Sequence, residues 1–157
     1  MAYVLQDLLK IRMMREQWAK DELIKAQNVL EEAIKKVEKK KKELEDFRIW
    51  RKEEEERLYA EIMLKHVKRT DIDGLKINIA NLEKKELEHV QAVDDAEQER
   101  EKAKEALAEA RSLYNLALVN VQKLEEHKET WMAEWSKEQE LLVEKEMEDF
   151  KSLKIQF

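Results

Sequence analysis

The sequence predicts an all-α fold, a long antiparallel coiled-coil hairpin of two helices. Three observations lead to this prediction. The 157 residues include no proline and only one glycine, charged residues make up 43% of the chain, and apolar residues recur at heptad spacing. Proline and glycine are the residues that most often turn or break a helix, so this chain can reverse direction very few times. Its charged fraction exceeds the roughly 25% of ordinary soluble proteins, as expected for helices with a largely exposed surface.

The first helix is predicted at about residues 3–69 from a seven-residue repeat. Eleven of its 16 repeat positions are apolar. The a positions are Leu9, Glu16, Leu23, Leu30, Val37, Leu44, Arg51 and Leu58, and the d positions are Leu5, Arg12, Ala19, Ala26, Ala33, Lys40, Phe47 and Glu54. A strict repeat of seven indicates packing against a partner helix in a left-handed supercoil.

The second helix is predicted at about residues 75–154, where 14 of 18 repeat positions are apolar. One series is Leu75, Leu82, His89, Ala96, Ala103, Ala110, Ala117, Leu124 and Trp131, and the other is Ile79, Glu86, Val93, Arg100, Leu107, Tyr114, Val121, Lys128 and Trp135. We call these positions of both helices the seam. Trp131 and Trp135 are therefore expected in the core.

A single turn is predicted at residues 70–74, so that residues 1–157 form one hairpin domain. The segment contains Thr70, Asp71, Asp73 and Gly74, which favour helix caps and turns. Because the apex would then lie near residue 72, facing residues should have numbers that add to about 143. The alternative is a homodimer of one continuous helix with a kink at Gly74.

Helix 1 also carries apolar residues outside the seam, at spacings of three and four that place them on one face. We call them the outer stripe, and Arg12 and Arg15 border it. The outer stripe consists of Val4, Leu8, Ile11, Met14 and Trp18. A large apolar surface that faces outward favours a binding site for another protein.

The C-terminal end of helix 2 carries a similar stripe beyond the predicted reach of helix 1, and it is expected to bind protein too. Its members are Val143, Met147, Phe150, Leu153 and Phe157. A drifting supercoil, a local three-helix contact or a frayed tail would also explain the two stripes. Ile49, Trp50 and Tyr59 form a secondary candidate patch.

The composition excludes several classes of function. One glycine cannot build a phosphate-binding loop, and His66, His89 and His127 lack companion ligands at helical spacing. We therefore expect no enzymatic activity, no cofactor and no metal site. A net charge of −6 argues against nucleic-acid binding. The chain contains no cysteine and no apolar run of membrane-spanning length, so no membrane insertion is expected.

The N-terminal segment Leu5-Gln6-Asp7-Leu8-Leu9-Lys10-Ile11-Arg12-Met13-Met14-Arg15-Glu16, followed by Ala19, Leu23 and Ala26, resembles the opening of the YscO/FliJ family of type III secretion proteins. That opening has leucines, then an L-x-x-R-x-x-x-E run, then a long charged coiled coil. The size, the single turn and the lack of proline are most similar to the YscO side of the family, including its chlamydial branch. Trp18, Trp50, Trp131 and Trp135 match no motif of the family.

The resemblance implies a stalk protein of a bacterial flagellar or injectisome export apparatus. It implies a place in the bacterial cytoplasm, peripheral to the inner-membrane apparatus. The implied partners are the hexameric export ATPase, the export gate and secretion chaperones, and the paired termini are the part that enters the ATPase ring. A generic coiled-coil tether and a prefoldin-like chaperone hairpin are the alternatives, although the latter would need strands beside its turn or termini.

Overall fold

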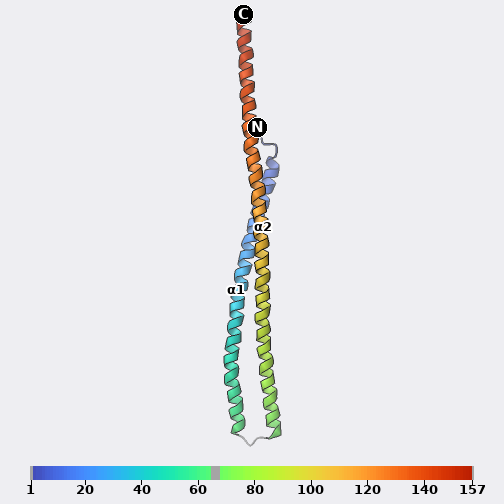
Figure 1. Cartoon of the computed structure of the whole chain (residues 1–157), viewed down its shortest axis with the longest axis vertical. Helices are drawn as coiled ribbons and strands as arrows, with labels where there is room; N and C mark the ends of the chain where they lie inside the picture. The colour runs from blue at the N-terminus through green and yellow to red at the C-terminus, as the bar shows by residue number, and fades with distance from the viewer. Residues whose placement is uncertain (1, 65–67, 157) are drawn as a thin grey trace. The chain divides into compact units, whose positions relative to one another are not determined.

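The computed structural model describes residues 2–64 and 68–156, with side chains to residue 154. Two α-helices account for nearly all of them: α1 spans Gln6–Met63 and α2 spans Arg69–Gln156 (Figure 1). No strand occurs within these described ranges. The predicted all-α class is confirmed.

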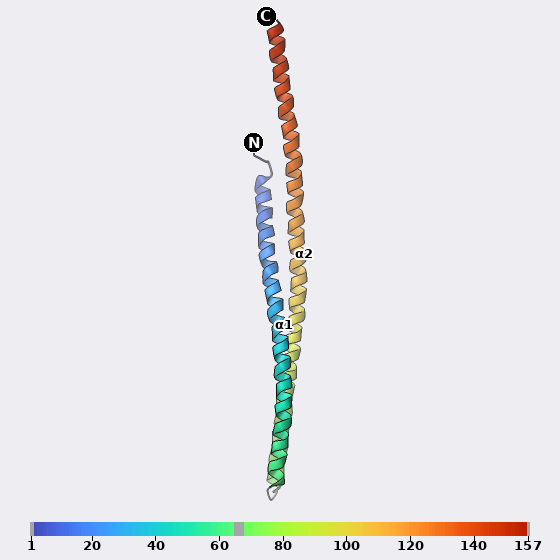
Figure 2. The same ribbon diagram turned by 90° about the vertical axis from the view of Figure 1, so that its left-hand side faces the viewer.

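The chain divides into two compact units, which we treat separately. The terminal unit comprises Met1–Leu23 and Ala110–Phe157, and the turn unit comprises Ile24–Glu109. In each unit a segment of α1 packs antiparallel against a segment of α2 (Figures 1 and 2). The predicted antiparallel hairpin is confirmed, and one continuous helix with a kink is excluded.

The heptad phase of both helices agrees with the burial of their side chains. All 16 seam positions from Leu5 to Leu58 and all 18 from Leu75 to Trp135 are buried or half-buried. The most buried are small or aliphatic: Val37 is 2% exposed, Ala96 1% and Leu9 4%. Removal of this apolar surface from water is the main force that pairs the helices.

The predicted turn at residues 70–74 is wrong, because these residues form the first turns of α2. The connection lies between Met63 and Arg69, and residues 65–67 within it are outside the described part of the chain. Asp71 does cap α2, but from inside the helix. Its carboxylate accepts a hydrogen bond of 3.1 Å from the backbone N–H of Lys68, as the third residue of a capping box does. Gly74 is helical and has no positive φ.

The predicted register is wrong as a consequence. Lys36 binds Glu99 and Tyr3 packs on Trp131, so facing residues have numbers that add to 135 and 134 instead of 143. The difference corresponds to a shift of a little more than one heptad between the helices. Such a shift returns nearly the same faces to each other, which explains why the predicted seam positions remain buried in the new register.

Candidate protein-binding surface

The core of the terminal unit fixes the face of α1 that turns toward α2. Leu9 lies at its centre with Val121 and Leu124, and Leu5 packs against them. All four occupy seam positions, so the opposite face of α1 is turned outward. The backbone N–H of Gln6 donates to the carbonyl of Tyr3 over 3.1 Å, which starts the helix.

Tyr3 anchors the N-terminal segment to α2. Its side chain is 6% exposed, its hydroxyl forms a hydrogen bond with Nδ1 of His127, and its ring meets Trp131 edge-on at 5.4 Å. Lys128 donates to the side-chain oxygen of Gln6 over 3.0 Å nearby. These contacts hold the start of α1 in place. The heptad pattern gave no sign of this anchor, because Tyr3 precedes the repeat.

The outer stripe is exposed along its full length. Val4 is 77% exposed, Met14 71% and Trp18 64%, whereas Leu8 and Ile11 are 37% and 46% exposed. The side chains therefore lie away from the α1–α2 core, as their spacing predicts. An indole that is mostly in contact with water keeps a large apolar area available for a partner.

Trp18 forms one wall of an apolar groove of about 400 Å³ between α1 and α2. The opposite wall comes from Leu113 and Leu116 of α2, which are 51% and 58% exposed. Neither leucine was predicted to belong to a binding surface. Their exposure could have been predicted from the sequence, because they are large apolar residues outside the two seam series of α2.

The two arginines beside the outer stripe differ in how accessible their charge is to a partner protein. Arg12 is half-buried and donates to the backbone carbonyl of Asn120 over 3.0 Å, so it contributes to helix pairing. Arg15 is exposed and lines the Trp18 groove. Of the pair, Arg15 is the one whose charge remains open to a partner.

The C-terminal part of α2 extends past the start of α1 within the terminal unit (Figure 2). Every residue from 136 to 154 is exposed. Val143, Met147, Phe150 and Leu153 are each more than half exposed, as the missing partner helix predicts. The side chain of Phe157 lies outside the described residues. We call residues 136–154 the tail.

The secondary patch lies in the turn unit. Ile49 is 56% exposed, Trp50 45% and Tyr59 49%, and the ring of Trp50 packs against Phe47 at 5.7 Å. Its members are spread over more than two helical turns. It has fewer members than the outer stripe.

A charged layer interrupts the seam of the turn unit. Arg51 forms ion pairs with Glu86 and, over 2.9 Å, with Glu55, while Arg48 reaches Glu86 at 2.9 Å. The hydrogen bond that Arg51 donates to Glu55, with a smaller contribution from Glu86, raises the pKa of Arg51 above its usual range. Lys41 also reaches Glu97 across the helices at 3.4 Å. The pairs that join α1 to α2, which are Arg51–Glu86, Arg48–Glu86 and Lys41–Glu97, favour one alignment of the helices.

Within the described part of the chain, no group of three or more His, Cys, Asp or Glu side chains could hold a metal ion. In the same residues, no helix has the length and apolar character that crossing a membrane requires. The surface features that remain are apolar and charged helix faces.

Known proteins share this architecture. The family model described as type III secretion protein YscO matches residues 5–153. The crystal structure of the type III secretion protein YscO from Vibrio parahaemolyticus has a TM-score of 0.88 and 25% identity, over 93% of this chain and 92% of that one. A putative YscO homologue from Chlamydia trachomatis has a TM-score of 0.80 and 22% identity, over 99% of this chain and 96% of the other. No curated protein sequence matches.

The family match covers nearly the full sequence, from the leucines that open α1 to the tail. It spans both helices and the connection between them, and the fold agrees with that of the Vibrio protein. The chain belongs to the YscO family of type III secretion proteins.

Proposed function

We propose that this protein is a stalk component of a bacterial type III secretion apparatus that docks on the hexameric export ATPase through its terminal unit. It would act in the bacterial cytoplasm, peripheral to the inner-membrane apparatus. Export gate and secretion chaperones are further partners that the family resemblance implies. Membership in the YscO family supports the first part of the proposal.

The exposure of the outer stripe is the main observation that supports the terminal unit as the docking surface. It places Trp18, Met14 and two aliphatic side chains on the face of α1 opposite the Leu9 core, and Val4 lies just before this helix. Aromatic residues with adjacent grooves are typical anchors of protein interfaces, and Arg15 at the border can steer an acidic partner. The tail adds Val143, Met147 and Phe150 at the same unit.

The direct test truncates Trp18 and Ile11, two members of the outer stripe, to alanine. The variant Trp18→Ala with Ile11→Ala should weaken binding to the purified export ATPase by about 2 kcal/mol or more, since a buried tryptophan anchor contributes that much. Its unfolding free energy should change by less than about 0.5 kcal/mol, because both side chains are exposed. Calorimetric titration and circular dichroism melting measure the two effects.

Ile49→Ala with Trp50→Ala is a matched control, because it deletes the same two residue types from the turn unit. We expect this control to bind the ATPase as the native chain does. Loss of binding in the control alone would move the docking surface to the secondary patch. A large loss of stability in Trp18→Ala would show instead that the indole is part of the core.

A further inference from the structure

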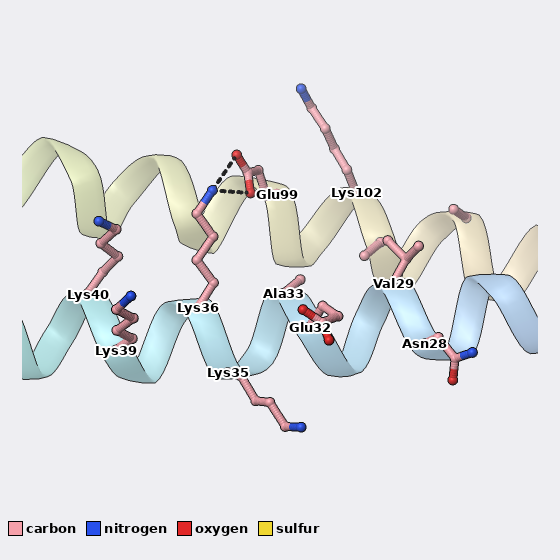
Figure 3. Close-up of a pocket in the computed structure, with 12 residues that line it drawn as sticks. Asn28, Val29, Glu32, Ala33, Lys35, Lys36, Lys39, Lys40, Glu99 and Lys102 are labelled. Atoms are coloured by element: carbon pink, nitrogen blue, oxygen red, sulfur yellow. Dashed lines mark hydrogen bonds and ion pairs between the residues drawn. The ribbon is translucent and has the colours of Figure 1, made fainter.

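The turn unit contains a groove between α1 and α2 whose lining is basic (Figure 3). Its floor includes the buried methyl groups of Ala33 and Ala103, which are 8% and 5% exposed. We call it the lysine groove, after the five lysines that line it: Lys35, Lys36, Lys39, Lys40 and Lys102. Because alanine ends at Cβ, a third helix could approach this floor closely.

The charge of the lysine groove is opposite in sign to that of the whole chain. Five lysines against Glu32 and Glu99 give the lining a net charge of +3, whereas the chain carries −6. Lys36 is held by Glu99 at 3.0 Å and Lys40 by Glu43 at 3.2 Å.

The other three lysines, Lys35, Lys39 and Lys102, form no ion pair in the described part of the structure. Figure 3 shows Lys35 leaving α1 and Lys102 leaving α2 in opposite directions, one at each margin of the groove. Within the described residues, these three ammonium groups therefore add positive charge to the lining without an ion pair.

The tail of α2 has the complementary character. Residues 138–150 hold six acidic residues and one lysine, a net charge of −5. Leu142, Val143, Met147 and Phe150 in the same segment are all more than half exposed, since α1 does not reach this far. On a helix, Glu140 and Glu144 border the Val143–Met147 face on one side and Glu146 borders it on the other.

We propose that the tail of one copy of this protein docks in the lysine groove of a second copy. The apolar face of the tail would cover the alanine floor, and its bordering carboxylates would meet Lys35, Lys39 and Lys102. Each copy carries both surfaces, so every copy can both supply a tail and accept one. A 13-residue helix is about 20 Å long, which matches the stretch of α1 from Asn28 to Lys40 that lines the groove.

This pairing occupies the tail, so it competes with any other protein that uses the tail. It concerns the chain alone and does not depend on docking to the export ATPase. The two proposals can therefore fail separately.

Analytical ultracentrifugation of the full chain tests the pairing. The mass should rise from 18.9 kDa toward twice that value as concentration increases. The association should weaken at least ten-fold between about 50 mM and 500 mM salt, because charge pairs at a surface are screened.

Charge reversal identifies the two surfaces. The groove variant, Lys35→Glu with Lys102→Glu, and the tail variant, Glu140→Lys with Glu144→Lys, should each self-associate at least ten-fold more weakly than the native chain. An equimolar mixture of both variants should associate again, since the acidic tail of the first meets the basic groove of the second, and the basic tail meets the acidic groove. Lys84→Glu with Lys85→Glu reverses two exposed lysines outside the groove and should change nothing.

A chain that stays monomeric at all concentrations in low salt would overturn the proposal. So would an association that both variants retain, because the interface would then lie elsewhere. A mixture that fails to restore pairing, with each variant still fully helical, would overturn it as well.

Discussion

The terminal unit and the turn unit use the same two helices in different ways. In the terminal unit a cluster of buried aliphatic residues, Leu9, Val121 and Leu124, forms the core of the seam, and further apolar side chains lie outside it. In the turn unit several of the buried seam residues are alanines, Ala33, Ala96 and Ala103, and the charged layer around Arg51 and Glu86 interrupts the apolar seam. The comparison separates two requirements of a coiled coil, since apolar burial supplies stability while polar layers select the register.

The largest expected effect comes from the core of the terminal unit. Leu9→Ala removes a side chain that is 4% exposed and should destabilise this unit by about 3 kcal/mol, the usual cost of a cavity at a buried leucine. Leu58→Ala, at a half-buried seam position of the turn unit, should cost about half as much. Amide hydrogen exchange, resolved by peptide, reports the opening free energy of each unit.

A conservative change serves as the control for this comparison. Leu9→Met keeps the volume of the side chain and should cost less than about 1.5 kcal/mol. Equal losses from Leu9→Ala and Leu58→Ala would contradict the idea that the terminal unit holds the stronger apolar core.

The heptad phase could be predicted from the sequence, whereas the register and the turn could not. Burial depends on the face that each helix presents, and this face follows from the spacing of residues such as Leu9, Leu23 and Leu30 within one helix. The register depends on where the chain reverses. Asp71 and Gly74 have the chemistry of a turn, but Asp71 acts as the third residue of a helical capping box.

In the candidate site, too, features that follow from spacing within one helix could be predicted, and features that depend on the register could not. Exposure of the outer stripe and of the tail follows from periodicity and was predicted, although their binding role stays a prediction. Arg12 was expected to border a binding surface, yet its guanidinium bonds the carbonyl of Asn120 on the other helix. The Trp18 groove was missed because its second wall, Leu113 and Leu116, depends on the register.

A change at Gly74 would sharpen the assignment of the turn. Gly74 has ordinary helical backbone angles, and a Cβ built on it meets no atom within 4 Å. Gly74→Ala should therefore stabilise the turn unit by about 0.5–1 kcal/mol, because alanine loses less conformational freedom in a helix. Thermal melting followed by circular dichroism measures the gain. A loss of stability would place Gly74 in a turn after all.

The smallest expected effect is a pH dependence confined to the turn unit. Glu54, at a seam position, accepts hydrogen bonds from Nε of Arg57 at 3.0 Å and from its terminal nitrogen at 2.5 Å. These bonds hold the pKa of Glu54 below its usual value of about 4.5. A carboxyl with a lowered pKa in the folded state stabilises that state fully above its unfolded pKa, and the contribution disappears as the pH falls through the folded pKa. The turn unit should therefore lose stability as the pH drops below about 4.5, and less so in high salt, which screens exposed pairs.

Glu54→Gln should flatten this part of the profile of stability against pH, whereas Glu53→Gln, on a neighbouring exposed residue, should not. Hydrogen exchange of the terminal unit should be the same in all three proteins, and a response there would show that the two units do not open independently.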